Sequence, residues 1–425
     1  MNIIHSTALS DGYIIDSPDR FRVSRQTFVN PEIEAQELNK VFKRCWLYLG
    51  HESELPNKGD YLVRNLAGHN LIFVRGRDNE LRALFNICPH RGATVCRDKG
   101  GNAKLFRCLY HSWSFDTTGK TAARPQAERY AEGIFDDGSF DLKPVAKISN
   151  YRGFVFVNFD ENAAQSLEEY LGGSLPYLDR IADKSEVMME VVGNHQYGVA
   201  ANWKTLAENG VDGYHVPLHA SYVEFMANVG EMDLSSDEFL GAMDVPLLDL
   251  GNGHSVTEYR GNWGRPVART LPKWSDEAKE AAAEVQAKLE ARHGKEYADK
   301  LCNEEFNMLI FPNLAVNDHF STNIRFLEPD GVGRMKVNSW SLAPKEEPEV
   351  LREIRRKNFI TFLGPGGLAT PDDAEALVHC QLGYFNDPDG WNELSRGVTE
   401  SKPVDSDELT LRAFWREWNR RMTES

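Results

Sequence analysis

The chain contains 425 residues, of which 41% are apolar and 26% charged, and this length and composition predict two or three ordinary globular domains. Its formal net charge of −16 argues against nucleic acid or an anionic membrane surface as a partner. No apolar run approaches the roughly 18 residues of a membrane-spanning helix, and the first residues lack the pattern of a secretory signal. The six cysteines show no disulfide-framework spacing, so we expect a cytoplasmic protein without a membrane partner.

The first part of the chain predicts an arm followed by a small β domain. Residues 1–40 hold polar turns and the start of a short helical pattern that extends over 31–46, and we assign this arm to the larger domain. Residues 41–160 are dominated by strand patterns separated by turn residues, namely 60–66, 71–76, 80–88, 112–121 and 151–160. We expect this segment to form an all-β domain inserted before the rest.

Residues 161–425 predict a larger α+β domain with an antiparallel sheet. Helical patterns occur at 166–173, 203–209, 275–294, 348–363 and 409–421, and strand patterns at 186–194, 307–316 and 335–344. Residues 321–344 read as a hairpin with Pro329-Asp330-Gly331 at its turn. Residues 226–264 have the weakest pattern, which fits either a mobile loop over a pocket or a plain surface excursion.

Two Cys/His pairs lie between residues 86 and 119. Cys88 and His90 form the first pair, Cys108 and His111 form the second, and seventeen residues separate His90 from Cys108. Two thiolates on one iron and two imidazoles on the other are the ligands of a Rieske [2Fe–2S] cluster, whose potential lies between about −150 and +300 mV. The alternatives are a structural zinc site, although zinc fingers usually keep Cys with Cys and His with His, or unrelated core residues.

A second group of metal-binding residue types follows in the larger domain. Asp212, His215 and His219 fall within eight residues, and a carboxylate with two imidazoles is the ligand chemistry of non-haem Fe(II) oxygenases. The histidines are four apart, so they would share a face of a helix. Pro217 fits a first helical turn and argues against one regular helix through both. The alternative is a helix start with partly exposed histidines; the next histidine along the chain is His254, so we keep His219.

Together these stretches resemble the large (α) subunit of the aromatic ring-hydroxylating non-haem iron dioxygenases, over essentially the whole chain. Rieske proteins of respiratory complexes carry a further cysteine in each loop, where this sequence has Gly92 and Trp113. The cluster therefore resembles the lower-potential kind of the oxygenases and their ferredoxins.

The resemblance also implies roles for residues of the second group. The family motif E-N-x-x-D-x-Y-H is matched by Glu208, Asn209, Asp212, Tyr214 and His215. It implies that His215 and His219 bind the mononuclear iron, although the family usually has four or five residues between them and this sequence has three. It implies that Asn209 lies near the iron and that Asp212 is a hydrogen-bonded electron bridge to a Rieske histidine of the neighbouring subunit.

The third iron ligand is expected after the Gly-rich turn at residue 364. The family pattern implies Asp373 rather than Asp372 as the carboxylate ligand. Residues 370–373, Thr-Pro-Asp-Asp, also read as a capping box with proline at the first helical position.

The implied reaction is cis-dihydroxylation of a small aromatic substrate with O2 and with electrons relayed from NAD(P)H through a reductase or ferredoxin. The resemblance further implies a small β subunit and a trimer, α3 or α3β3, and subfamilies that act on benzoate-, cumate- or biphenyl-type aromatics. A Rieske monooxygenase or demethylase is the alternative; a pure electron-transfer module would not need the larger domain.

Five basic residues lie between positions 91 and 107, beside the Cys/His pairs: Arg91, Arg97, Lys99, Lys104 and Arg107. They form either a docking surface for an acidic electron donor or an ordinary solvated face.

Overall fold

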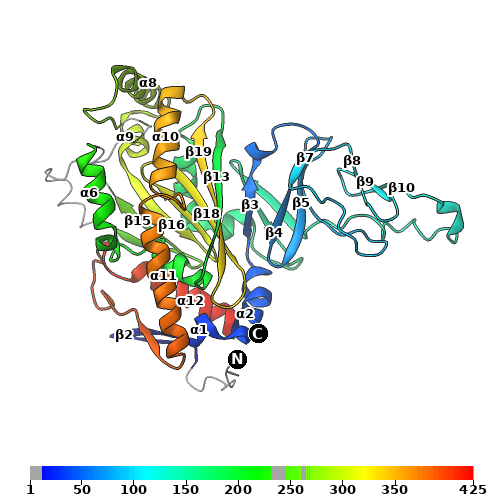
Figure 1. Cartoon of the computed structure of the whole chain (residues 1–425), viewed down its shortest axis with the longest axis horizontal. Coiled ribbons are helices and arrows are strands. Elements are labelled where there is room, and N and C mark those ends of the chain that lie inside the picture. The colour runs from blue at the N-terminus through cyan, green and yellow to red at the C-terminus, as the bar shows by residue number, and fades with distance from the viewer. Residues whose placement is uncertain (1–11, 231–245, 260–264, 266, 268, 425) are drawn as a thin grey trace. The chain divides into compact units, whose positions relative to one another are not determined.

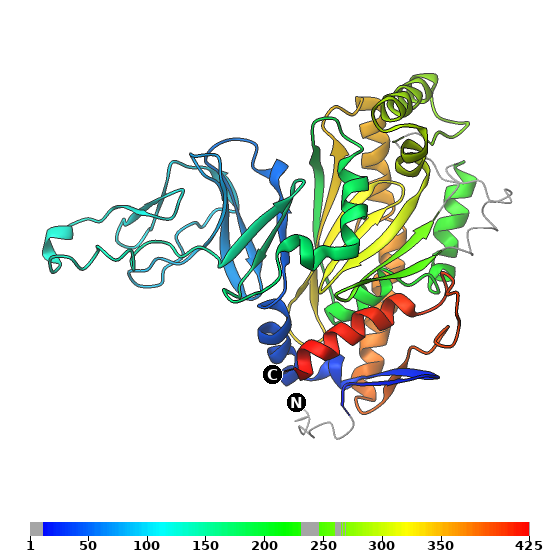
Figure 2. The same ribbon diagram turned by 180° about the vertical axis from the view of Figure 1, so that it is seen from behind.

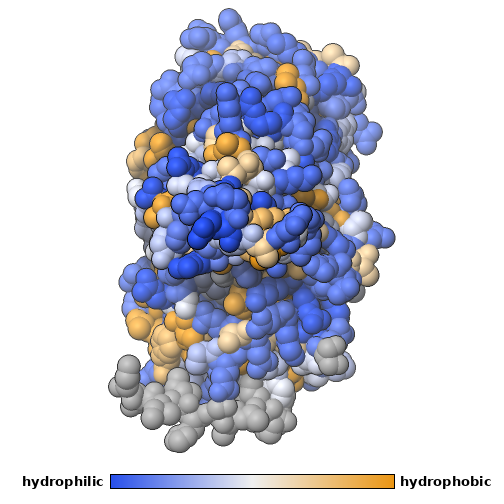
Figure 3. All heavy atoms as spheres, turned by 90° about the vertical axis from the view of Figure 1, so that its right-hand side faces the viewer, coloured by the Kyte–Doolittle hydropathy of each residue, from blue (hydrophilic) through white to orange (hydrophobic). Residues whose placement is uncertain are grey.

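The computed structural model describes residues 12–230, 246–259, 265, 267 and 269–424 (Figure 1). The chain divides into two compact units: one comprises Met1–Val41 with Glu168–Ser425, and the other comprises Phe42–Leu167. The sequence had placed these divisions after residues 40 and 160. Among the described helices, none is long and apolar enough to cross a membrane. The face drawn in Figure 3 is mostly hydrophilic, as the charged composition leads one to expect.

The smaller unit consists of antiparallel strands and short helical turns. One sheet has the order β11-β12-β3, a second β6-β5-β4-β7 and a third β10-β9-β8. The strands are β3 (Leu47–His51), β4 (Asp60–Leu66), β5 (His69–Arg75), β6 (Leu81–Phe85), β7 (Gly100–Asn102), β8 (Leu105–Arg107), β9 (Ser114–Asp116), β10 (Thr121–Ala123), β11 (Lys147–Tyr151) and β12 (Phe154–Asn158). Short 3-10 turns lie at Glu52–Glu54 and Ala127–Arg129.

A two-residue turn and a shared core define the centre of this unit. Ala67 and Gly68 join β4 to β5, and both have positive φ, as a tight hairpin turn requires. Apolar side chains from the second and third sheets pack with the two Rieske-motif cysteines into one buried cluster, which includes Ile72, Val74, Leu84, Phe106, Trp113 and Phe115. The two Cys/His loops therefore pack against one common core.

The larger unit is built on a seven-stranded antiparallel sheet of order β13-β19-β18-β17-β16-β15-β14. Its strands are β13 (Met189–Val199), β14 (Leu247–Gly251), β15 (His254–Tyr259), β16 (Glu305–Ile310), β17 (Leu314–Asp318), β18 (Thr322–Pro329) and β19 (Met335–Pro344). The predicted hairpin is confirmed, since β18 pairs with β19, from Pro329 opposite Met335 beside the turn to Thr322 opposite Leu342. The expected single strand over 307–316 is wrong: the chain reverses after Ile310 and returns as β17.

Helices cover both faces of this sheet. The views from front and back place α10 and α11 over one face and α4 and α12 over the other (Figures 1 and 2). The helices are α1 (Gln26–Val29), α2 (Pro31–Glu37), α3 (Leu167–Leu171), α4 (Leu175–Ala182), α5 (Trp203–Asn209), α6 (Ala220–Asn228), α8 (Asp276–His293), α9 (Lys295–Asn303), α10 (Glu349–Thr361), α11 (Ala369–Asn386) and α12 (Leu409–Thr423). A π-helical turn, Leu38–Phe42, follows α2, and 3-10 turns lie at Gly172–Ser174 and Val216–His219. A separate small sheet has the order β1-β2-β20, formed by Ile14–Ser17, Arg20–Ser24 and Trp391–Glu393.

One buried carboxylate of the N-terminal arm contacts two helices of the larger unit. Glu37, at the end of α2, accepts hydrogen bonds from Lys204 Nζ at 2.7 Å, Trp203 Nε1 at 3.1 Å and Trp418 Nε1 at 2.8 Å. Three donors satisfy a charge that would otherwise be costly to bury. This contact ties the arm to α5 and α12, in agreement with its assignment to the larger unit.

Two segments of the larger unit differ from the sequence prediction or lie partly outside the described residues. The capping box at 370–373 is wrong, because α11 begins two residues earlier than predicted, at Ala369, and its N-cap is Leu368 without a side-chain hydrogen bond. In the weakly patterned segment 226–264, residues up to 230 continue from α6 and residues 247–259 form β14 and β15. The mobile-loop interpretation of the remainder concerns residues 231–245 and 260–264, which lie outside the described residues.

Candidate metal centres and substrate pocket

The two histidines of the second group lie at the ends of one 3-10 turn. The side chain of Asn202 caps α5, which ends at Asn209. After a short irregular stretch, His215 is the N-cap of the turn Val216–His219, with Pro217 in its first positions, and α6 follows directly. The expectation that Pro217 prevents one regular helix is confirmed. The two rings lie 5.3 Å apart between centroids.

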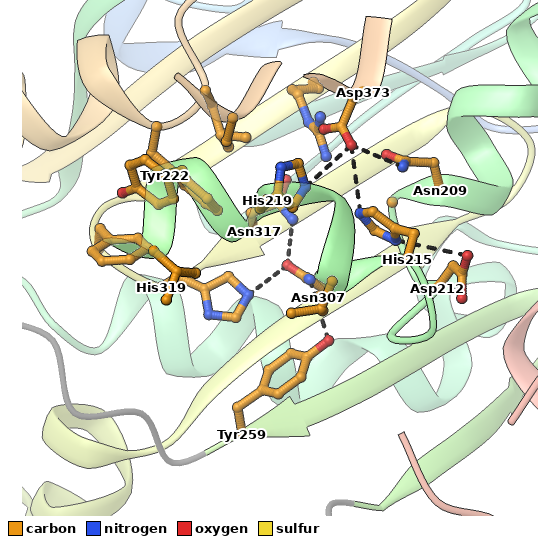
Figure 4. A pocket seen from close by; sticks show the side chains of 18 residues that line it. Asn209, Asp212, His215, His219, Tyr222, Tyr259, Asn307, Asn317, His319 and Asp373 are labelled. Carbon is orange, nitrogen blue, oxygen red and sulfur yellow. Dashed lines mark hydrogen bonds and ion pairs between the residues drawn. The ribbon is translucent and has the colours of Figure 1, made fainter. Parts of the chain in front are cut away.

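Asp373 of α11 completes a compact set with these histidines. Its Oδ1 lies 3.5 Å from Nε2 of His215 and 3.2 Å from Nε2 of His219 (Figure 4). One ligand atom from each residue lies within 4.8 Å of the others, a spacing that can hold a metal ion. Asn209 donates a hydrogen bond from Nδ2 to the same Oδ1 at 3.0 Å. Two imidazoles and one carboxylate fit the facial ligand set of a non-haem Fe(II) site.

The outer nitrogens of both histidines face further carboxylates. Nδ1 of His219 lies 3.4 Å from Oδ2 of Asp372, and Nδ1 of His215 lies 3.7 Å from Oδ2 of Asp212. The second distance is too long for a hydrogen bond, and within the described part of the chain this buried Nδ1 has no hydrogen-bond partner. The carboxylate of Asp372 thus orients the His219 ring, as such partners do for ligand histidines, and Nε2 of both rings faces Asp373.

Burial and charge act in opposite directions on Asp373. Burial by itself raises its pKa, but hydrogen bonds and charges from His219, His215 and Asn209 bring the pKa below the ordinary value for aspartate. The carboxylate is therefore available as an anionic ligand.

The other residues of the E-N-x-x-D-x-Y-H match lie away from the metal-binding point. Burial raises the pKa of Glu208 to about 8, and its Oε1 accepts a hydrogen bond from Trp415 Nε1 at 2.6 Å. Tyr214 is 56% exposed, and the guanidinium of Arg396 lies 4.2 Å from its ring centroid. Glu208 thus fastens α5 to α12, whereas Tyr214 lies at the surface.

The two Cys/His loops of the smaller unit have the same backbone design. Cys88 N donates to Ala93 O and Cys108 N to Trp113 O, each at 2.8 Å and each five residues on. The residue four after each cysteine, Gly92 or Ser112, has positive φ and donates back to the cysteine carbonyl. Both cysteines are 2% exposed, and the rings of His90 and His111 lie 4.6 Å apart. Two buried thiols and two adjacent imidazoles from matching loops fit a cluster with one Cys₂ iron and one His₂ iron.

A cavity of about 160 Å³ adjoins the trio of His215, His219 and Asp373. One part of its wall is apolar and aromatic: Tyr222, Val223, Phe320, Phe362, Leu363 and Ala369. Another part is polar: Tyr259, Asn307, Asn317, His319 and Arg325. The sequence motifs did not predict these polar residues, because the pairing of strands, rather than their spacing along the chain, brings them together. His254, the next histidine in sequence, instead lies fully buried against Tyr170 and Phe311.

Two family models match the chain. The Rieske [2Fe-2S] domain matches residues 45–147, and the ring hydroxylating alpha subunit (catalytic domain) matches residues 187–424. The 2-halobenzoate 1,2-dioxygenase large subunit of Burkholderia cepacia is 37% identical, over 89% of this chain and 80% of that protein. Toluate 1,2-dioxygenase subunit alpha of Pseudomonas putida is 34% identical, over 89% and 82%. The structure of naphthalene 1,2-dioxygenase from Rhodococcus sp. bound to indole matches with a TM-score of 0.79 at 28% identity, over 94% of each chain.

The chain belongs to the ring-hydroxylating oxygenase alpha subunits, with a Rieske domain preceding the catalytic domain. The α+β architecture predicted from the sequence is confirmed. Its cofactors are a Rieske [2Fe–2S] cluster and a mononuclear iron, with NAD(P)H acting indirectly through electron-transfer partners. As the terminal oxygenase component, it uses O2 to dihydroxylate an aromatic ring, and the relatives favour this reaction over the monooxygenase alternative.

Proposed function

We propose that this oxygenase cis-dihydroxylates a substituted benzoate at the metal site formed by His215, His219 and Asp373. The observation that carries the proposal is the placement of this trio in the wall of a largely aromatic cavity. A cavity of about 160 Å³ compares with the ~150 Å³ apolar cavity that binds benzene in another protein. The names of the 2-halobenzoate and toluate enzymes supply the benzoate class.

The ligand assignments are part of this proposal. Cys88 and Cys108 would hold one iron of the cluster and His90 and His111 the other, while the trio would hold the mononuclear iron. When bound, the cluster supplies single electrons and the mononuclear iron supplies the O2-activating centre. The protein's own side chains would orient these groups: Asp212 and Asp372 lie behind the histidines, and Asn209 donates a hydrogen bond to Asp373. The aromatic pocket would hold the substrate ring and limit the access of water.

Metal and sulfide analysis tests these assignments. Iron-replete protein should hold about three irons and two acid-labile sulfides per chain, two of the irons in the cluster. Replacing Cys108 by Ala should remove the cluster and keep the mononuclear iron, and replacing His215 by Ala should do the reverse. Stoichiometric zinc without sulfide would contradict the assignment and restore the structural zinc alternative.

We further propose that the protein works as a head-to-tail trimer, α3 or α3β3 with a small β subunit, in the cytoplasm. Apolar side chains are exposed on the Rieske loops, where Ile87 is 53%, Leu109 58% and Tyr110 56% exposed. They are exposed again around His215, where Tyr214 is 56% and Val216 51% exposed. Burying one set against the other set of a neighbouring subunit would remove both from water. Asp212, close to His215, would then connect the two metal sites.

Mixed oligomers test the assembly. Cys108→Ala chains without a cluster and Asp373→Ala chains without mononuclear iron are each expected to be inactive. Co-expressed into common oligomers, they should recover partial activity, because a head-to-tail neighbour sets an intact cluster beside an intact iron site. Verified mixed oligomers that stay inactive would contradict electron transfer between subunits.

A further inference from the structure

Four polar residues of the cavity wall lie on or directly after three neighbouring strands. Asn307 of β16 pairs directly with Asn317 of β17, and Tyr259 of β15 pairs with Glu305 of β16. Side chains two residues apart in a strand share a face, so Glu305 and Asn307 lie together, as do Asn317 and His319 near the end of β17. Figure 4 shows Asn307 between Asn317, His319 and Tyr259. The group is therefore held by the sheet itself.

Hydrogen bonds fix the orientation of the Asn307 amide. Its Oδ1 accepts from Asn317 Nδ2 and lies 2.7 Å from His319 Nε2. Its Nδ2 donates to the hydroxyl of Tyr259 at 3.4 Å. Nδ1 of His319 lies 3.3 Å from Oε2 of Glu305. The two ring nitrogens of His319 thus face side-chain oxygens of Asn307 and Glu305.

The carboxylate behind His319 is already shared with other cations. Glu305 is fully buried, and Arg269 lies 2.9 Å and Arg265 3.7 Å from its Oε1. Burial alone raises the pKa of Glu305, but Arg269, His319 and Arg265 bring it below the ordinary value. Two guanidiniums and the His319 ring thus share this one carboxylate.

A second buried carboxylate lies nearby. Asp318 accepts from Arg265 NH2 at 2.9 Å and also pairs with Lys184. Arg265, Arg269 and Lys184 therefore face two carboxylates. Burial lowers the pKa of Lys184 to about 7, so this group ranges from balanced to cationic near neutral pH.

Hydrogen-bonding capacity remains unfilled at the cavity surface. Asn317 is 4% exposed, and its Oδ1 has no partner within the part of the chain that the structure describes. Asn307 and Asn317 each use one amide hydrogen in the contacts above, which leaves one on each. A bare hydrocarbon ring would leave all of these groups unpaired.

We propose that Asn307, Asn317, His319 and Tyr259 bind the carboxylate of an aromatic acid and thereby orient its ring toward His215, His219 and Asp373. This inference rests on the proposed benzoate-type function and assigns residues to it. The remaining amide hydrogens and the Tyr259 hydroxyl donate to the carboxylate, and the nearby cations Arg265, Arg269 and Lys184 stabilise its negative charge. Oδ1 of Asn317 takes an ordered water or a donor on the adjacent ring carbon. The ring itself lies against the aromatic wall.

The test compares benzoate with nitrobenzene, its neutral isostere, by calorimetric titration of the iron-replete holoprotein. Wild-type protein should bind benzoate at least tenfold more tightly than nitrobenzene. Asn317→Leu keeps the side-chain shape and removes the amide, so benzoate binding should weaken at least tenfold while nitrobenzene binding stays within twofold. His319→Gln should weaken benzoate selectively in the same way. Asn338→Leu is the matched control, because Asn338 lies in the same sheet, pairs with Gln196 and is absent from the cavity wall.

The outcomes separate this inference from the proposed function. Unchanged benzoate binding in both variants, or equal weakening of benzoate and nitrobenzene, would overturn the carboxylate site and leave the benzoate function standing. Wild-type protein with full iron content that binds nitrobenzene but not benzoate, or neither, would overturn both. Iron content and the cluster spectrum, measured on every variant, exclude loss of metal as the cause.

Discussion

Asp372 and Asp373, neighbours in α11, face opposite sides of the His219 ring. Asp373 Oδ1 lies 3.2 Å from Nε2, and Asp372 Oδ2 lies 3.4 Å from Nδ1. Only Asp373 also approaches His215, at 3.5 Å. Asp373 therefore occupies a ligand position, and Asp372 lies behind a ligand histidine.

The first prediction separates these two positions. Asp373→Ala should lose the mononuclear iron, because it removes the anionic member of the trio. Asp372→Asn should keep the iron with an affinity about 10–100-fold weaker, as for other partners behind a ligand histidine. Iron titration of the apoprotein measures both, with the cluster spectrum as the internal control. Iron loss in the Asp372 variant with retention in the Asp373 variant would reverse the assignment.

The second prediction concerns Asp212 as the electron bridge. Asp212→Asn should retain cluster and mononuclear iron, since Asp212 is not in the trio, but should slow electron transfer between them. The measurement is the substrate-dependent reoxidation of the reduced cluster, followed by absorbance in a single turnover. Reoxidation at the wild-type rate would remove Asp212 from the electron path.

The third prediction tests the cationic residues on the smaller unit as a docking surface. Arg91, Arg97, Lys99, Lys104 and Arg107 are all exposed. An acidic ferredoxin should reduce the double variant Lys99→Glu/Lys104→Glu more slowly than the wild type, and this rate should depend less on salt. The reason is that electrostatic steering between exposed charges is screened over about 10 Å at 0.1 M salt. A double variant with the same net charge, Lys295→Glu/Lys402→Glu, changes exposed residues of the other unit and serves as the control. Equal effects of the two double variants would support an ordinary solvated face.

The fourth prediction is a pH dependence of stability from His254. Its Nε2 donates to Tyr170 O at 2.7 Å and its Nδ1 accepts from Phe311 N at 2.9 Å, so the folded protein holds the neutral ring. Burial lowers its pKa to about 4, whereas the unfolded chain protonates it below about 6.5. Stability should therefore fall as the pH drops from about 6.5 to about 4, by about 2 kcal/mol between pH 7 and pH 5.

Urea unfolding at pH 7 and pH 5 measures this contribution. His254→Gln should be less stable at pH 7 and should lose about 2 kcal/mol of the pH dependence, because its amide does not titrate. His51, buried in the other unit with its pKa also lowered to about 4, stays in place in both proteins. An unchanged pH dependence in the variant would rule out His254 as its source.

The sequence was informative where function depends on local spacing. Both Cys/His loops and the pair His215 and His219 are short-range patterns, and the hairpin at 329–335 follows from turn chemistry. Asn307, Asn317 and His319 could not be predicted, because the pairing of β16 with β17 brings them beside the trio and no motif records that pairing. The start of α11 was misplaced by two residues, since Thr370 resembles a cap but lies buried inside the first turn.

Product analysis under labelled oxygen tests the proposed function most directly. Iron-replete protein, supplied with electrons by a matched reductase and ferredoxin, should convert a substituted benzoate under ¹⁸O2 into a cis-diol that carries two labelled atoms from one O2. A monohydroxylated or demethylated product with a single labelled atom, or no product despite a reduced cluster and full iron content, would contradict the proposal.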